Sequence, residues 1–152
     1  MFAVGEAAPD FELLSDTGAA VRLSAFRGRR VILFFFPRAA TPGCTTQACG
    51  LRDHFPAIEA AGATVIGVSP DAPETLAKWK VAEGLPYTLL SDPDKAVATQ
   101  YNAYGEKSMY GKVYMGIIRS HFVIDAAGNF EDVQVKISPK KSIEKAVQQV
   151  TG

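Results

Sequence analysis

The sequence predicts a single α/β domain over residues 1–152, in which helices cover a central sheet. The chain has 152 residues, 47% of them hydrophobic, which is enough for one buried core and too few for two ordinary domains. Continuous apolar runs at residues 31–37 and 64–70 are typical of strands buried on both faces. A segment of helix-forming residues separates the two runs, and this order predicts a βαβ unit.

In the N-terminal half, residues 10–23 fit a hairpin at the edge of the sheet, with its turn at Asp16–Gly18. The first apolar strand follows at residues 31–37. A helix is expected from about Gly43 to Gly62, because glycine commonly lies just past the end of a helix. The second apolar strand then completes the βαβ unit.

In the C-terminal half, Pro73 in a first turn and Gly84 after the last turn predict a helix between them. The remaining expected elements are a strand at 87–90, a turn at 91–94, a short helix at 95–101, a hairpin of 117–125 with 130–137, and an amphipathic helix at 139–150. Residues 105–116 are assigned to a loop, with Tyr110 and Met115 expected at a pocket wall.

Charge and hydropathy limit the possible partners. Sixteen Lys and Arg residues balance sixteen Asp and Glu residues, and no basic stripe with interleaved aromatic residues suits a phosphate backbone. The first residues lack a basic leader, and no apolar run reaches the roughly 18 residues of a membrane span. We therefore expect a cytoplasmic protein that binds neither nucleic acid nor membranes. We also expect a monomer.

The only two cysteines, Cys44 and Cys49, lie five positions apart. In the first turn of a helix, unpaired N–H groups and the helix dipole would stabilise a Cys44 thiolate. Five residues along the same helix turn Cys49 by about 140° and separate the Cα atoms by roughly 8 to 9 Å. Because a disulfide needs about 7 Å or less, the two sulfur atoms can bond only if the helix unravels. Gly50 and Pro56 weaken the helix locally.

Three other interpretations of the cysteines compete. Free cysteine often acts as a small core hydrophobe. A metal site could use Cys44, Cys49 and His54, although the spacing does not match paired Cys-x-x-Cys ligands. A general dithiol exchanger would also favour Cys-x-x-Cys, which lets the two sulfur atoms meet without unfolding.

The motif "PRAATPGCTTQAC" matches the active-site pattern Pro-x-x-x-Thr-x-x-Cys of peroxiredoxins, and "YGKVYMGIIRSHFVID" is similar to the segment that supplies their active-site arginine. The second cysteine, five residues after the first, resembles the bacterioferritin comigratory protein, or Q, subgroup. The resemblance covers nearly the whole chain. It implies a thioredoxin-like fold, with a central mixed β-sheet flanked by helices and an N-terminal β-hairpin extension.

Carried over by position, the resemblance makes Cys44 the peroxidatic cysteine and Cys49 the resolving cysteine. Pro37, Thr41 and Arg119 would complete the pocket. The sequence departs from the family pattern at Arg38–Ala40, at His121, where Thr is more usual, and at Pro56, which interrupts the helix. His54 and His121 have no obvious partner, so we expect them on the surface or in the core rather than in catalysis.

The peroxidase chemistry requires these residue types. A thiolate attacks one peroxide oxygen, and negative charge moves to the leaving oxygen. The Thr41 hydroxyl can hold the peroxide, and Arg119 offers several donors to the moving charge. Lowering a thiol pKa from about 8.5 to about 6 raises the thiolate fraction only about thirtyfold at pH 7. Pre-organised donors must therefore supply most of the remaining acceleration.

The sequence thus predicts a thiol-dependent peroxidase for hydrogen peroxide and organic hydroperoxides. Cys44 would become a sulfenic acid, Cys49 would condense with it to a disulfide, and thioredoxin or a similar dithiol would restore both thiols. No metal or organic cofactor is implied. A peroxide-sensing switch protein and a general thiol–disulfide exchanger remain alternatives.

Overall fold

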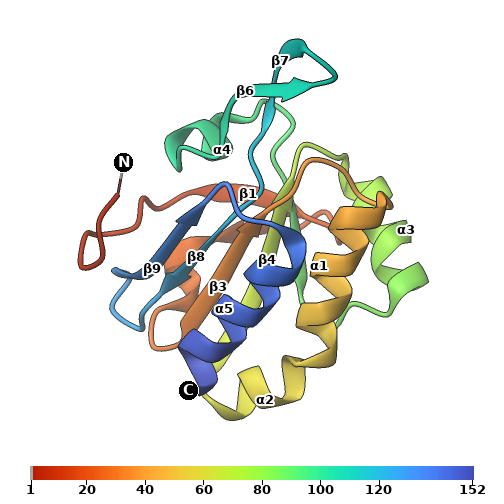
Figure 1. Cartoon of the computed structure of the whole chain (residues 1–152). Helices are drawn as coiled ribbons and strands as arrows, with labels where there is room; N and C mark the ends of the chain where they lie inside the picture. The colour runs from red at the N-terminus through yellow and green to blue at the C-terminus, as the bar shows by residue number, and fades with distance from the viewer. Residues whose placement is uncertain (1) are drawn as a thin grey trace.

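Seven strands form one mixed sheet in the order β2-β1-β5-β4-β3-β8-β9 (Figure 1). This computed structural model describes residues 2–152. The strands of the sheet are β1 Glu12–Ser15, β2 Ala20–Arg22, β3 Arg30–Phe35, β4 Ala63–Ser69, β5 Thr88–Ser91, β8 Ser120–Ile124 and β9 Phe130–Val135. Strands β3, β4 and β5 run parallel, and the pairs β1–β5, β3–β8 and β8–β9 are antiparallel.

Helices cover both faces of this sheet (Figure 1). They are α1 Pro42–Asp53, α2 Phe55–Ala60, α3 Pro73–Glu83, α4 Ala96–Gln100 and α5 Pro139–Thr151, with a 3-10 turn at Leu23–Phe26. None of the helices in residues 2–152 is both long and apolar enough to cross a membrane.

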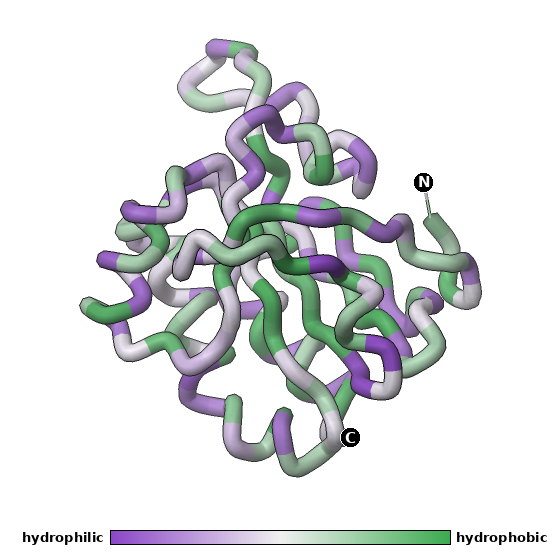
Figure 2. The backbone as a smooth tube through the Cα atoms, turned by 180° about the vertical axis from the view of Figure 1, so that it is seen from behind, coloured by the Kyte–Doolittle hydropathy of each residue, from purple (hydrophilic) through white to green (hydrophobic). Residues whose placement is uncertain are grey.

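The core lies in two layers, one on each face of the sheet, because successive strand residues point to opposite sides. On β3, Phe34 belongs to a cluster with residues of α1, α2, α3 and α5, whereas Phe35 belongs to a cluster with residues of α4 and the N-terminal segment. Figure 2 shows hydrophobic residues along the strands through the middle of the molecule. All seven residues of β4 are buried, as its continuous apolar run predicts.

Most of the expected elements are confirmed, including the edge hairpin of β1 and β2. The single helix expected from Gly43 to Gly62 is wrong, since α1 ends at Asp53 and α2 begins at Phe55. Pro56 explains the break. It has no N–H to continue the α1 ladder, but its fixed φ suits the first turn of α2.

The loop expected at residues 105–116 is also wrong. This segment instead forms an antiparallel hairpin of β6 Tyr104–Met109 and β7 Lys112–Ile117, which projects from the body of the molecule (Figure 1). Tyr110 and Gly111 make its two-residue turn, both with positive φ, as a type I′ turn requires. Tyr110 is 98% exposed and Met115 is 55% exposed, so neither lines a buried pocket wall.

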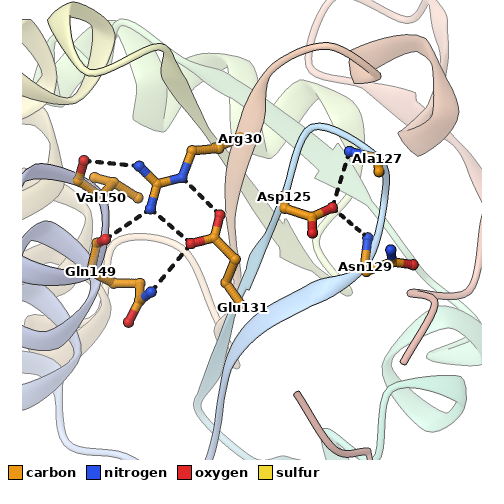
Figure 3. Close-up of polar contacts among 7 residues, drawn as sticks. All are labelled: Arg30, Asp125, Ala127, Asn129, Glu131, Gln149 and Val150. Carbon is orange, nitrogen blue, oxygen red and sulfur yellow. Dashed lines mark hydrogen bonds and ion pairs between the residues drawn. The ribbon is translucent and has the colours of Figure 1, made fainter. Parts of the chain in front are cut away.

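An ion pair fastens the sheet to the end of α5 (Figure 3). Arg30 of β3 donates from Nε and Nη2 to the two carboxylate oxygens of Glu131 of β9, at 2.7 and 2.8 Å. Its guanidinium also donates to the carbonyl oxygens of Gln149 and Val150. The hydrogen bonds from Arg30 outweigh desolvation and lower the pKa of Glu131.

We expect Glu131→Gln to lower the free energy of unfolding by about 1–2 kcal/mol at pH 7, because a charge-assisted bidentate pair is lost. The lowered pKa means that this contribution is complete above the unfolded value of about 4.3 and fades as the pH falls below it. Urea unfolding at pH 7 and pH 3 measures the effect, and the two proteins should converge at the lower pH. Glu12→Gln, which breaks an exposed pair with Arg22, is the control. An equal loss in both variants would contradict the prediction.

Candidate active site

Cys44 lies in the first turn of α1, directly after the loop that leaves β3. Thr41 is the N-cap, Pro42 is the first helical residue, and Cys44 is 1% exposed. The first intrahelical hydrogen bond to the cap runs from Thr45 N–H to the Thr41 carbonyl. The N–H groups of Gly43 and Cys44 therefore have no acceptor inside the helix and favour negative charge beside the Cys44 sulfur.

Arg119 reaches Cys44 from the two-residue link between β7 and β8. Its Nη2 lies 3.3 Å from Cys44 Sγ. The sheet register explains this meeting, because Phe35 at the end of β3 pairs with Ser120 at the start of β8. Gly43 permits the close approach, since a Cβ there would lie 3.2 Å from Arg119 Nη2.

Gln47 holds the other arm of the guanidinium. Arg119 Nη1 donates to Gln47 Oε1 at 2.7 Å, and Gln47 is completely buried. Sequence reasoning missed this residue, although its position three residues after Cys44 places both side chains on one face of α1. The two contacts fix the plane of the guanidinium relative to the sulfur.

The loop before α1 places Thr41 and Pro37 beside the helix start. Thr41 Oγ1 donates its single proton to the Arg38 carbonyl at 2.7 Å, so its lone pairs remain available to accept. Pro37 is half-buried in the same loop. Asp71, which the sequence did not single out, anchors this loop by accepting a hydrogen bond from Ala39 N–H at 2.8 Å.

A cavity of 600 Å³ opens beside Arg119. Its lining combines apolar side chains with two lysines, and the residues are Glu106, Lys107, Ser108, Val113, Ile118, Arg119, Lys136, Ile137 and Ser138. Burial and the nearby charge of Arg119 lower the pKa of Lys107, while Cys44 acts in the opposite direction.

Cys49 lies in a different environment. Its thiol donates to Glu83 Oε1 at 3.4 Å, at the end of α3, and Arg52 Nη1 donates to the Glu83 carbonyl. Burial raises the pKa of Cys49, the hydrogen bond to Glu83 raises it further, and Arg52 opposes both only in part. Because the thiolate is the nucleophile, these contacts lower the reactivity of Cys49 in the folded helix.

The two histidines lie away from both sulfur atoms. His54 is exposed, and its Nδ1 lies 2.9 Å from the Gly50 carbonyl. His121 is completely buried between Ser142 and Asp132. The structure therefore does not bring Cys44, Cys49 and His54 together as metal ligands. Residues 2–152 contain no group of three or more His, Cys, Asp or Glu side chains that could hold a metal ion.

Comparison with known proteins gives a consistent family. A model described as the AhpC/TSA family matches residues 4–133. The protein named peroxiredoxin Bcp in Escherichia coli K12 is 49% identical over 129 residues, which cover 85% of this chain and 83% of that protein.

Two solved structures of related proteins have the same fold as this chain. The crystal structure of peroxidoxin BcpB from Mycobacterium tuberculosis has a TM-score of 0.87 at 34% identity, covering 99% of this chain and 97% of that chain. The bacterioferritin comigratory protein of Xanthomonas campestris, solved as trapped intermediate and ligand complexes in work on alkyl peroxide reduction, has a TM-score of 0.86 at 28% identity, covering 92% and 89%. The expected thioredoxin-like fold with a central mixed sheet is confirmed.

We expect Glu83→Ala to make Cys49 more reactive in the reduced protein, because the substitution removes a hydrogen-bond acceptor and a negative charge that both raise the pKa of Cys49. In a Cys44→Ser background, alkylation by iodoacetamide at pH 8 should accelerate about two- to tenfold. Glu59→Ala on the exposed side of α2 is the matched control. Equal alkylation rates in the two variants would show that Glu83 does not restrain Cys49.

Proposed function

The chain belongs to the AhpC/TSA family and is a thiol-dependent peroxidase, and we propose that Cys44 is its peroxidatic cysteine and Cys49 its resolving cysteine. The observation that carries this assignment is the 3.3 Å contact between Arg119 Nη2 and Cys44 Sγ at the start of α1. A guanidinium and unpaired helix N–H groups favour a thiolate at Cys44, whereas Cys49 faces the carboxylate of Glu83.

In the first step, the Cys44 thiolate attacks the terminal oxygen of the hydroperoxide. A sulfur–oxygen bond forms, the oxygen–oxygen bond breaks, and its electron pair leaves with the second oxygen. That oxygen takes a proton and departs as water or an alcohol, and Cys44 becomes a sulfenic acid. Since Thr41 already donates to Arg38, its hydroxyl oxygen accepts from the peroxide O–H and orients the substrate.

Arg119 serves this step as a catalytic residue. Its guanidinium donates toward the sulfur and has further N–H groups for the oxygen on which negative charge develops. Gln47 holds the guanidinium in place by accepting a hydrogen bond from Arg119 Nη1. Pro37 shields the thiolate without offering a hydrogen-bond donor of its own.

In the second step, the Cys49 sulfur attacks Sγ of the sulfenic acid, water leaves, and a disulfide forms. Helix geometry separates the two Cα atoms by roughly 8 to 9 Å, so α1 must unravel first. The contacts that must break include Cys44 with Arg119, Cys49 with Glu83, and the 2.6 Å hydrogen bond from Tyr87 Oη to the Ala48 carbonyl. An external dithiol such as thioredoxin then reduces the disulfide by exchange.

The cavity supports organic hydroperoxides as substrates alongside hydrogen peroxide. Val113, Ile118 and Ile137 offer apolar surface next to Arg119, which suits the alkyl part of an organic hydroperoxide. The protein would act in the cytoplasm as a monomer. One chain suffices for the cycle, because both cysteines lie on the same helix. No metal or organic cofactor takes part in the proposed cycle.

We expect Cys44→Ser to abolish peroxide turnover, because the nucleophile is lost. Cys49→Ser should consume one equivalent of peroxide and then stop as a sulfenic acid that over-oxidises readily. Mass spectrometry and steady-state turnover with thioredoxin measure both outcomes. Full recycling of Cys49→Ser would remove Cys49 from the cycle. A wild-type protein that reacts once and is not recycled by any dithiol would instead support a sensor.

Arg119→Met and Thr41→Val should each slow the oxidation of Cys44 by about a hundredfold or more, because each removes one pre-organised hydrogen-bonding group. The quantity to measure is the second-order rate constant with hydrogen peroxide and with an alkyl hydroperoxide. The exposed residues Arg22 and Thr99 provide matched controls as Arg22→Met and Thr99→Val, since Thr99 also donates to a backbone carbonyl. Near-normal rates in both active-site variants would mean that thiol acidity alone drives the reaction.

A further inference from the structure

A chain of polar side chains leads from Arg119 through the interior to the far edge of the sheet. Gln47 Nε2 lies 2.9 Å from Ser142 Oγ on α5, and Ser142 Oγ lies 2.8 Å from His121 Nδ1 on β8. His121 Nε2 lies 3.3 Å from Asp132 Oδ2 on β9. Gln47, Ser142 and His121 are all completely buried. The peroxidase cycle described above uses only the first of these residues.

The direction of the first hydrogen bonds follows from Arg119, which can only donate. The amide atom of Gln47 that faces Arg119 must therefore be the carbonyl oxygen, and the amide nitrogen must face Ser142. Ser142 Oγ accepts this hydrogen bond. Its own proton must go to a different acceptor.

The other end of the chain is fixed by Asp132, whose carboxylate can only accept. Desolvation acts to raise the pKa of Asp132, but hydrogen bonds from His121 and Gln134 outweigh it, so the group is held below its ordinary value and stays ionised at neutral pH. His121 must then carry its proton on Nε2. In a neutral imidazole this leaves Nδ1 as an acceptor for the Ser142 hydroxyl proton.

Every donor in this hydrogen-bonded series thus has an acceptor. The directions that Arg119 sets at one end are compatible with those that Asp132 sets at the other. Among residues 2–152, the Ser142 hydroxyl forms hydrogen bonds only with Gln47 and His121. The opposite imidazole tautomer would place a bare Nε2 against the Asp132 carboxylate, and it would make His121 a second donor to Ser142. The Ser142 proton would then have no acceptor in the chain.

We propose that His121 and Ser142 are positioning residues of the peroxidase: His121, held as the Nε2–H imidazole by Asp132, takes the Ser142 proton and so keeps the Gln47 carbonyl on Arg119. This inference rests on the proposed role of Cys44. If Ser142 instead donated to Gln47, the Gln47 amide would turn and present its NH2 group to the guanidinium. Two donors would then face each other, and Arg119 would lose the contact that holds it 3.3 Å from Cys44 Sγ.

The tautomer can be measured directly by ¹⁵N NMR of the imidazole rings in the reduced protein at pH 7. The chain has only two histidines, so His54→Asn assigns the spectrum, and the exposed His54 ring serves as an internal reference. We expect the His121 signals of a neutral Nε2–H ring. An Nδ1–H ring, or a ring protonated on both nitrogens, would overturn the proposal.

The positioning role is tested by Ser142→Ala, with Ser15→Ala as the control for loss of a buried hydroxyl far from Arg119. We expect Ser142→Ala to slow Cys44 oxidation by peroxide about tenfold or more, since the donor Arg119 remains but loses its fixed orientation. Alkylation of Cys44 by iodoacetamide forms no peroxide leaving oxygen, so it should change much less. The informative quantity is the rate of Cys44 oxidation by peroxide divided by the rate of Cys44 alkylation, and Ser142→Ala should lower this ratio.

An unchanged ratio in a folded Ser142→Ala protein would mean that these hydrogen-bonded side chains have only a structural role, and it would overturn the inference. His121→Leu removes the acceptor of the Ser142 proton and should lower the same ratio, and Ser142→Ala decides the question if this variant does not fold. A wild-type Cys44 that fails to react with peroxide would instead refute the proposed function, while the NMR measurement would still report the tautomer.

Discussion

Helix α1 carries both cysteines, and the two halves of the proposed reaction require this helix in different states. In the proposed cycle, attack on peroxide needs the folded helix, because its first turn brings Cys44 to Arg119 and to unpaired N–H groups. Disulfide formation needs the same turn to open, since five residues of regular helix hold the two Cα atoms roughly 8 to 9 Å apart. The contacts around α1 must therefore hold the helix folded for the first step and allow it to open for the second.

In the folded state, α1 is held by polar contacts that come from several elements. Arg119, Ser142 and Tyr87 each bond to a different residue of the helix, at Cys44, Gln47 and Ala48 in turn. Helix α5 also packs closely, because a Cβ on Gly50 would lie 2.2 Å from Ile143 Cδ1. Gly50 therefore serves close helix packing as well as backbone freedom. In the proposed cycle, oxidation of Cys44 replaces the sulfur group that Arg119 contacts, which would weaken one of these contacts when the helix must open.

The sequence contained enough information for the order of the main strands and helices, because continuous apolar runs and Pro or Gly at helix ends are local signals. It did not reveal the β6–β7 hairpin. Those strands are largely exposed, and Tyr110–Gly111 replaces the usual Asn-Gly turn signal. The family motifs supplied Cys44, Cys49, Thr41, Pro37 and Arg119 as candidate site residues. Glu83, Asp71 and Ser142 could not be found in this way, since each reaches α1 or its loop from a distant part of the chain.

The requirement that α1 open is tested most directly by hydrogen exchange on the reduced and disulfide-linked proteins. With mass spectrometry confirming a Cys44–Cys49 bond, we expect the amides of residues 45–53 to be protected in the reduced protein and to exchange much faster in the oxidised one. The amides of β4, whose seven residues are all buried, provide an internal reference that should not change. Equal protection of residues 45–53 in both states would contradict the account, because two cysteines five residues apart in an intact helix cannot form a disulfide.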